Sequence, residues 1–549
     1  MTSRVSFLAC LACRQERLKC DALTPACGHC AQTGTECSYT KSQRRSKSST
    51  RKRRARSNVP LEQPDELTVN IVDLPREQHL PCGSQSTESR ASSVNLIGPE
   101  GKMAHATRPA FGSQTPGSSL ARNESYLFSI YYAYFHPAHP ILLPWQLFKQ
   151  AQLPSYLKQV VEFVATHFTT GASGDTYRNT IVETVLKQAP AVEKVQALLL
   201  LSIALHSRTE HVESEICLAA AVDLALELGL HRATYAETAS PNDSIRAECL
   251  RRTWWEVFVI EGLLVFFGKQ RICRTALVPL EVPLPCEEST YQEGLTLPIP
   301  QTITQFDARI FSDEEREFSS YAYRIDAVRI LNWTLTNREM VGCQQKLTEA
   351  VDARIASWFH HLPSAKAELL RPDGSVDEIM FQAVMIVNSA SIHINFSHSD
   401  LLSSPAAISD VICSHQGSTG DTPFSSHTHA MKAIKAATEL SSLAAISLPV
   451  EKHTPFLVCA LALSCVVQLA ACSDKAGQTL DATRDHIALS LGVLKSMGQN
   501  WALSQMIMHQ VKAVARDVLD LGIGTPKDLF DFTTFLDMNG QFFMDGVIN

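Results

Sequence analysis

Six cysteines near the N-terminus are the residues whose spacing most clearly indicates chemistry. They follow the pattern C-x2-C-x6-C-x6-C-x2-C-x6-C, at Cys10, Cys13, Cys20, Cys27, Cys30 and Cys37. Zinc takes four ligands in a tetrahedron, and thiolates suit it. One ion would leave two cysteines over, whereas two ions need eight ligand positions, which six thiolates fill only if two of them bridge both metals. The spacing therefore predicts two Zn²⁺ ions, with a disulfide knot or chance as the alternatives.

The rest of the sequence argues against a disulfide framework. The apolar run from Val5 to Cys13 has the character of a short signal peptide, but Arg14, Arg17 and Lys19 follow it at once. The other ten of the 16 cysteines are scattered without regular spacing, mostly in apolar stretches, where free cysteine behaves as a small buried hydrophobe. This usage favours a reducing compartment.

Charge is divided unequally along the chain of 549 residues. The net charge is −7, but residues 1–56 hold 13 Lys and Arg against three acids, a net of +10, which leaves −17 for the remainder. Such asymmetry indicates that the basic residues 1–56 contact nucleic acid and that the acidic remainder of the chain does not need to. Residues 41–56 contain nine Lys and Arg and no acid. This tract is either a solvated charge run or, as we favour, a nuclear import signal that also contacts DNA phosphates, through Arg44, Arg45, Arg51, Lys52, Arg53 and Arg54.

With its basic neighbours, the segment Cys10–Cys37 closely resembles the fungal zinc binuclear cluster transcription factors. The resemblance implies that Cys10 and Cys27 are the bridging ligands and that the basic segment between Cys13 and Cys20 is a recognition helix. It also implies double-stranded promoter DNA as the partner and the nucleus as the location. Substituting Cys13 or Cys30 by alanine is then expected to abolish binding to a CGG-containing duplex.

The same resemblance implies different roles for individual residues of the basic segment. Arg17 aligns with the base-reading lysine of the family, which typically reads CGG-type triplets, and arginine can donate two hydrogen bonds to guanine O6 and N7. Arg14 and Lys19 are better candidates for phosphate contacts, which set register and affinity. Glu16 stands where a basic residue is common, so the exact triplet stays open.

Beyond the basic tract, composition separates a linker from a helical body. Residues 57–122 contain seven Pro, nine Ser and five Gly, with one aromatic residue, and predict a disordered linker. From residue 123 onward apolar residues recur at helical spacing, and no alternating strands or internal repeats stand out. The spacing of Ile216, Ala219, Ala220 and Leu224 predicts the apolar face of a helix that ends before Gly229. We expect further helices near 244–267, 318–341, 345–361, 376–397, 427–446, 454–473, 482–497 and 500–520.

A second resemblance covers roughly residues 123–475. The opening Tyr134-Phe135-His136-Pro137, the segment 225–232 and Arg251-Arg252-Thr253-Trp254-Trp255 resemble motifs of the fungal-specific transcription factor domain, also called the middle homology region. Departures from that pattern occur at Glu261, Gly262 and 268–270. We interpret the two tryptophans as core and the two arginines as helix caps or salt-bridge partners, with a ligand role as the alternative.

Membrane and enzymatic chemistry are both disfavoured. Residues 455–472 form an uncharged run of 18, which we interpret as a buried core helix in preference to a transmembrane span. No dinucleotide-binding, phosphate-loop, H-E-x-x-H or G-x-S-x-G motif is present. The pairs His136/His139, His360/His361 and His393/His398 lack a third ligand at suitable spacing, so we interpret them as ordinary helix-face histidines. No enzymatic activity is predicted.

The C-terminal residues 521–549 alternate Asp with Phe and Leu. This pattern is typical of an amphipathic activation segment that recruits coactivators, and the alternative is packing of its phenylalanines on the body. Family members often dimerise through a coiled coil just after the cluster, but Pro60, Pro64, Pro75 and Pro81 interrupt any heptad pattern here. The protein is therefore expected to bind DNA as a monomer or to pair as a homodimer through its body.

These observations predict a mostly α protein in five parts. They are a zinc cluster DNA-binding domain (1–40), a basic linker with the import signal (41–56), a disordered linker (57–122), an all-α regulatory domain (123–520) and the acidic-aromatic tail (521–549). The predicted function is RNA polymerase II transcription regulation, as a pathway-specific activator of the kind found in secondary-metabolite gene clusters. A repressor or a ligand-sensing regulator is the first alternative. An enzyme or metabolite-binding protein with an accessory zinc module is a less favoured one.

Overall fold

The computed structural model divides the chain into two compact units, Met1–Met103 and Ala104–Asn549. It describes residues 13, 20, 26–35, 37, 116–169, 175–268, 272–294, 296–312, 316–336, 344–408, 423–446, 449–472 and 479–518. Several predictions lie outside the described residues: Cys10, Arg14, Arg17, Lys19, the tract 41–56 with its six basic contact residues, the linker up to residue 115, and the tail 521–549.

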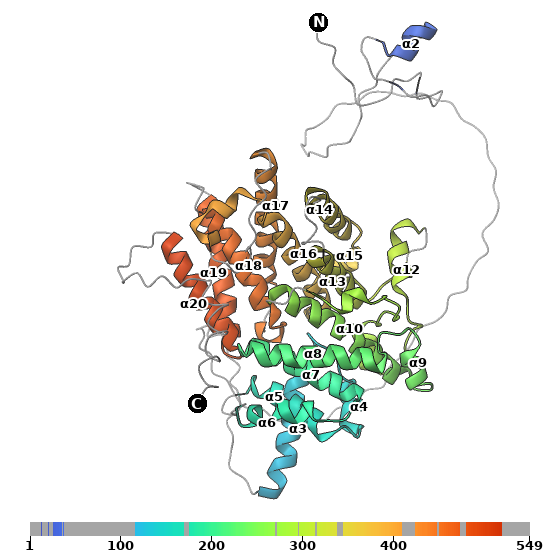
Figure 1. Ribbon diagram of the computed structural model, residues 1–549, viewed down its shortest axis with the longest axis vertical. Helices are drawn as coiled ribbons and strands as arrows, with labels where there is room; N and C mark the ends of the chain where they lie inside the picture. The colour runs from blue at the N-terminus through green and yellow to red at the C-terminus, as the bar shows by residue number, and fades with distance from the viewer. Residues whose placement is uncertain are drawn as a thin grey trace, which may run out of the picture. The chain divides into compact units, whose positions relative to one another are not determined.

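The described residues are helical, which confirms the mostly α prediction (Figure 1). No strand occurs among them, and their β-pairing consists of one isolated bridge between Leu370 and Val376. The principal helices are α2 (Gly28–Thr33), α3 (Pro116–Tyr134), α4 (Trp145–Gln150), α5 (Ser155–Thr166), α6 (Asp175–Leu186), α7 (Val192–Ser207), α8 (His211–Leu228), α9 (Tyr235–Ala239), α10 (Ser244–Phe267), α11 (Glu288–Glu293), α12 (Ile303–Ala308), α13 (Ser320–Thr336), α14 (Gln344–His360), α15 (Ser364–Ala367), α16 (Glu378–Phe396), α17 (Pro423–Leu443), α18 (Phe456–Cys472), α19 (Thr479–Met497) and α20 (Ala502–Val518).

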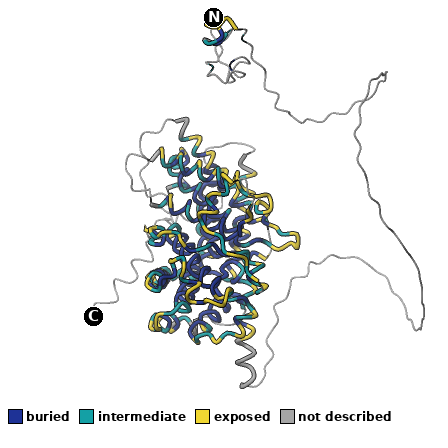
Figure 2. Tube along the Cα trace, turned by 90° about the vertical axis from the view of Figure 1, so that its right-hand side faces the viewer, coloured by how far each residue is buried: buried dark blue, intermediate teal, exposed yellow. Residues whose placement is uncertain are grey.

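Helix α10 forms the centre of the helical unit. The side chain of Asp243 caps its first turn by accepting a hydrogen bond from the backbone N–H of Arg246 (2.9 Å). Every residue from Ala247 to Val265 is buried, as expected for a helix surrounded by other helices. α10 packs against α7, α8 and α13, and α13 in turn packs against α16, so that a buried interior runs through the unit (Figure 2).

Helix α8 ends where the sequence predicts, but its buried face differs from the prediction. Gly229 takes the left-handed conformation (φ +80°) that terminates the helix. Leu224 of the predicted face is buried, but Ile216 is 48% exposed and Ala219 and Ala220 are half-buried. The residues that pack inward are Ser214, Cys217, Leu218, Ala221, Val222, Leu224 and Ala225. The predicted face was wrong because small apolar residues occur all round this helix, and packing against α7 selects the face that is buried.

Two apolar helices lie inside the unit. α18 is buried along its length from Phe456 to Ala471, in agreement with its interpretation as a core helix. Among the described residues, α16 is the one helix long and apolar enough to cross a membrane by length and composition, and 83% of its apolar window is buried. α16 packs against α13, α17 and α18.

Gly262 permits close packing of α10 on α13, and its substitution gives a testable effect. A Cβ at this position would lie 2.7 Å from Val328 Cγ1 and 3.2 Å from Asn332 Oδ1. Gly262→Ala is therefore expected to lower the free energy of unfolding by about 1–3 kcal/mol through overpacking, measured by urea denaturation. Adding Val328→Ala should restore much of that stability.

The matched control for this substitution is Gly492, inside α19. A Cβ there meets nothing within 4 Å. Gly492→Ala should raise stability by about 0.5–1 kcal/mol, because alanine loses less conformational freedom than glycine in a helix. Equal effects of the two substitutions would contradict the close-packing explanation.

Candidate metal centre and polar core

The described cysteines of the N-terminal unit fall into two overlapping groups. Cys13, Cys20 and Cys27 form one group, and Cys27, Cys30 and Cys37 form the other, with the sulfur atoms of each group within 4.8 Å of one another. Cys13, Cys27 and Cys30 are buried, while Cys20 and Cys37 are half-buried. The structure thus brings together five of the six predicted metal ligands, and Cys27 is the member that both groups share.

Local backbone geometry places Cys27 at the centre. It is the N-cap of α2, where its Sγ accepts a hydrogen bond from the backbone N–H of Cys30 (3.4 Å). The N–H of Cys27 donates to Cys37 Sγ (3.3 Å). Gly34 ends the short helix in the left-handed conformation (φ +67°), which turns the chain back toward Cys37. The C-x2-C step therefore places the sulfurs of Cys27 and Cys30 at the first turn of α2. The turn at Gly34 then brings the sulfur of Cys37 back to them.

The chemistry of this donor set fits zinc. Cys13 Sγ and Cys27 Sγ lie 3.6 Å apart, well beyond the ~2.05 Å of a disulfide, and none of the described cysteines is in a disulfide. Thiolates packed this closely repel one another unless a cation lies between them, and Zn²⁺ accepts four such ligands. The N–H···S hydrogen bonds to Cys27 and Cys37 orient the sulfurs and stabilise their charged form.

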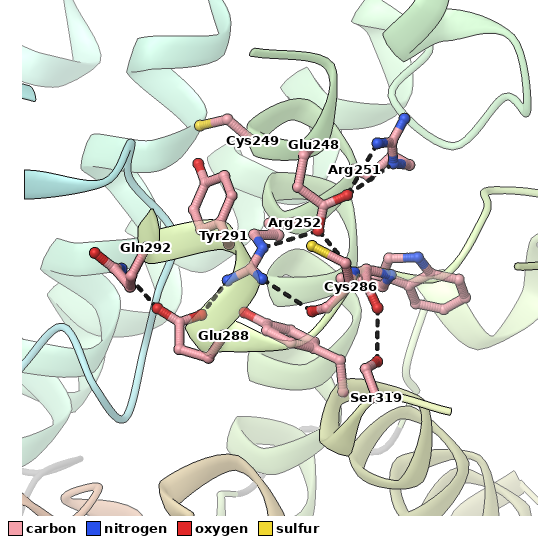
Figure 3. Close-up of polar contacts among 12 residues, drawn as sticks. Glu248, Cys249, Arg251, Arg252, Cys286, Glu288, Tyr291, Gln292 and Ser319 are labelled. Carbon is pink, nitrogen blue, oxygen red and sulfur yellow. Dashed lines mark hydrogen bonds and ion pairs between the residues drawn. The ribbon is translucent and has the colours of Figure 1, made fainter. Parts of the chain in front are cut away.

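In the helical unit, Arg252 organises a buried polar cluster (Figure 3). Its fully buried guanidinium donates to Glu248 (Nε–Oε1 3.0 Å), to Glu288 and to the carbonyl of Cys286 (3.0 Å), and it lies 3.9 Å from the ring centroid of Tyr291. Burial opposes the charged form of Glu248, but Arg252 and Arg251 outweigh burial and lower its pKa. The prediction of salt-bridging arginines is confirmed.

The neighbouring motif residues are structural as well. Arg251 pairs with Glu248 (2.9 Å) and with Glu237 (2.8 Å), and so ties α9 to α10. Trp254 and Trp255 are fully buried, as predicted, and Trp255 Nε1 donates to the carbonyl of Pro283 (3.0 Å). These contacts give the motif a role in holding the helices together.

A second buried cluster surrounds Glu256 and was not identified from the sequence. Arg324 forms an ion pair with Glu256 and donates to Gln382 Oε1 (2.9 Å), and Tyr321 donates to Glu256 (2.8 Å). Although burial opposes ionisation, Arg324 outweighs it and lowers the pKa of Glu256 to about 2. His139 Nδ1 lies 3.7 Å from Glu256, and burial lowers the pKa of this histidine. The cluster joins α10, α13 and α16 to the segment that follows α3.

The histidine pairs considered as metal ligands have other partners. His139 Nε2 is hydrogen-bonded to Thr454 (3.0 Å), and His136 Nε2 lies 2.9 Å from Gln292 Nε2. His361 and His398 each bond a backbone carbonyl one helical turn earlier. Among the described residues, the groups of three or more metal-ligating side chains consist of cysteines alone.

Buried neutral histidines predict acid sensitivity. His206 Nε2 lies 3.7 Å from Cys459 Sγ, and burial, followed by the nearby His211, lowers its pKa from 6.5 to about 3. The unfolded chain takes up this proton below about pH 6.5 and the folded chain does not until about pH 3, so stability falls as pH drops through this range. At pH 5 the decrease is roughly 2 kcal/mol for this residue. His206→Gln should make the decrease in urea midpoint between pH 7 and pH 5 smaller.

The control for this prediction is His427, whose side chain is 64% exposed. His427→Gln should leave the pH dependence of the urea midpoint as it is in the unaltered protein. A His206→Gln protein with the same pH dependence as the unaltered chain would refute the assignment.

Two family models match this chain, one over the segment of the metal centre and one over part of the helical unit. Residues 8–46 match the fungal Zn(2)-Cys(6) binuclear cluster domain, and residues 129–338 match the fungal specific transcription factor domain. Zinc cluster domains bind zinc and DNA, so the N-terminal unit belongs to a class of DNA-binding modules. Both family models, and a relative that aligns over most of the chain, describe fungal zinc cluster transcription factors, so the chain is similar to transcription factors and not to enzymes.

Two relatives have similar sequences. The C6 finger domain transcription factor iacK of Pestalotiopsis fici is 28% identical over 560 aligned residues, which cover 93% of this chain and 80% of the relative. The sorbicillinoid biosynthetic cluster transcription factor sor3 of Hypocrea jecorina is 31% identical over 106 residues, or 19% of this chain and 16% of the relative. No solved structure matches the chain.

Proposed function

We propose that the protein is a nuclear, sequence-specific regulator that binds CGG-like triplets in promoters through a cluster of two Zn²⁺ ions. The proposed ligands are Cys10, Cys13, Cys20, Cys27, Cys30 and Cys37, with Cys10 and Cys27 as the bridging pair. The observation that carries the proposal is the position of Cys27 in both sulfur groups, because a shared thiolate is what six cysteines need in order to complete two tetrahedra.

The proposed DNA contacts divide into base reading and phosphate binding. Arg17→Ala should relax base preference at one position of the triplet by about 1–3 kcal/mol, because the substitution removes a bidentate arginine–guanine pair. The measurement is a competition binding series over all single-base variants of the site. Equal discrimination by the substituted and unaltered chains would contradict the assignment.

The matched comparison is neutralisation of Arg51, Lys52, Arg53 and Arg54 to glutamine. These residues are proposed to contact phosphates, together with Arg14, Lys19, Arg44 and Arg45, so their neutralisation should weaken binding to every duplex alike. The slope of log affinity against log salt concentration should become shallower by about 0.9 for each phosphate that the chain no longer neutralises. The same substitution in a fluorescently tagged chain tests the proposed nuclear import signal.

The proposed regulatory output is activation of a single biosynthetic pathway through the tail 521–549 and a coactivator. The alternation of Asp with Phe and Leu in the tail supports this proposal, and the name of one relative refers to a biosynthetic gene cluster. A reporter activated by the tail fused to an unrelated DNA-binding domain would support activation, and reduced reporter output would support the repressor alternative. Genome-wide occupancy of the tagged chain would identify the target promoters.

The proposed domain limits are 1–40, 41–56, 57–122, 123–520 and 521–549, with pairing through the helical body or monomeric binding. Removing residues 1–56 should abolish promoter occupancy. Under the alternative of a metabolite-binding protein with an accessory zinc module, the shortened chain would keep its activity.

A further inference from the structure

A pocket on the helical unit is lined by residues outside the Arg252 and Glu256 clusters. It has a volume of about 260 Å³ and is lined by Asp307, Arg329, Ile330, Trp333 and Arg354. These residues come from α12, α13 and α14, which are labelled in Figure 1. A volume of this size accommodates a small organic molecule with one ring.

Positive charge exceeds negative charge around this pocket. Arg329 binds Asp307 through both Nη atoms (2.7 and 2.9 Å), and its Nη1 also donates to Asp326 Oδ1 (3.0 Å). Arg354 Nη2 donates to the same Asp326 oxygen (2.7 Å). A third guanidinium, that of Arg309, interacts electrostatically with Asp326, Asp307 and Arg354. Three cations thus share two carboxylates among the described residues.

Two of the arginines have donor capacity beyond these pairs. Arg354 pairs with Asp326 through Nη2 and lines the pocket with a side chain that is 31% exposed, so it has N–H donors beyond this pair. Arg309 donates through Nη1 to the carbonyl of Phe306 (2.7 Å), while its Nε is buried without a hydrogen-bond partner. Burial lowers the pKa of Arg309, while Asp326 opposes this effect and Arg354 adds to it.

The pocket lining also includes two apolar side chains, Trp333 and Ile330. Trp333 is 38% exposed, whereas Trp254, Trp255, Trp358 and Trp501 are each 2% exposed or less. Ile330, one helical turn before Trp333, is 1% exposed, so Trp333 supplies the accessible apolar surface. An exposed indole beside guanidinium groups offers stacking for a ring and hydrogen bonds for an anion at the same place.

We propose that this pocket binds a small organic carboxylate that carries a ring, with the carboxylate against Arg354 and the ring against Trp333. The anion supplies the negative charge that the three arginines lack. Arg354 can pair with a carboxylate through two parallel N–H groups, a geometry that lysine cannot reproduce. The proposal does not depend on DNA recognition, because no lining residue belongs to the N-terminal unit.

The test uses 3-phenylpropanoate as the probe and 3-phenylpropanol as its neutral counterpart, titrated into the full chain and followed by ligand-observed NMR. The acid should bind saturably with a dissociation constant of about 1 mM, a value typical of a ligand of this size. The alcohol should bind at least tenfold more weakly. Arg354→Gln and Trp333→Leu should each weaken binding of the acid about tenfold.

The control variant is Arg371→Gln, which removes an arginine of similar exposure (38%) that pairs with Asp377 elsewhere on the unit. It should bind the probe as the unaltered chain does, and circular dichroism should give the same helix content for all variants. Absence of saturable binding, equal binding of the alcohol, or unaltered binding by Arg354→Gln would each overturn the proposal.

The chain's own tail offers the same chemistry, because Asp531 and Phe532 put a carboxylate beside a ring. A chain that ends at Val518 distinguishes the two sources. A free acid is the ligand if the truncated and full chains bind the probe equally. If truncation strengthens binding tenfold or more, the tail occupies the pocket and the proposal of a free acid is overturned.

Discussion

Cys27→Ser is expected to reduce the zinc content of the protein from two ions to none and to abolish specific DNA binding. Cys27 belongs to both sulfur groups, so its substitution leaves each proposed zinc site with an incomplete set of ligands. Serine can still cap α2 by accepting from the backbone N–H of Cys30, so the substitution removes the metal ligand and keeps the cap. Because metal binding supplies the folding energy of such small domains, a chain without either ion has an unfolded module. Affinity for a CGG-containing duplex should fall at least ~10³-fold, to the non-specific level.

Zinc content is measured by mass spectrometry of the purified chain, and binding by gel shift at fixed salt concentration. Cys472→Ser is the control, since that residue is a half-buried cysteine at the end of α18 and far along the chain from the cluster. It should keep two ions and full affinity. A Cys27→Ser protein that retains both ions would refute the assignment of Cys27 as a shared ligand.

The second large effect is expected for Arg324→Met. This change leaves the carboxylate of Glu256 buried without its guanidinium partner, although Tyr321 still donates to it. Removing one member of a buried ion pair costs about 3–5 kcal/mol, because the remaining charge has no compensation. The urea midpoint of the helical unit should fall accordingly, with DNA binding by the N-terminal unit preserved.

The double substitution Glu256→Gln with Arg324→Met separates charge from packing. It removes both charges, so it should recover at least half of the stability that the single variant lacks. Lys187→Met, which breaks an exposed pair with Glu183, is the surface control and should leave the midpoint unchanged. If the double variant is less stable than Arg324→Met, the ion pair is not the cause of the destabilisation.

The sequence predicted the positions of the helices more reliably than their faces. α10 spans Ser244–Phe267, in agreement with the helix predicted near 244–267. α8 ends before Gly229 as predicted, yet Ile216 faces outward. Periodicity identifies a buried face only when polar residues mark the opposite one. In α8 alanines and leucines occur on several sides, so tertiary packing decides.

The two sites differ in how far sequence reasoning could find them. Cysteine spacing is a local signal: it predicted one cluster of metal ligands, and the five described cysteines lie together. Glu256 and Arg324 have no such signal, because their helices carry several other charged residues and the two side chains meet only when α10 packs on α13. Charged residues at positions where the helical pattern requires apolar ones are the indication that could have identified them.

The hydrogen bond between His139 and Thr454 has a consequence for synthesis of the chain, because the two residues are 315 positions apart. At about 5–20 residues per second, a ribosome needs roughly 15–60 s to make the intervening residues. Arg324 and Gln382 are added during that interval, and Gln382 must then reach back to the carbonyl of Ala138 (2.6 Å). Until Arg324 and Gln382 have been synthesised, Glu256 and the carbonyl of Ala138 on the nascent chain lack these two partners. We expect the newly made body to need chaperone protection until α18 has emerged.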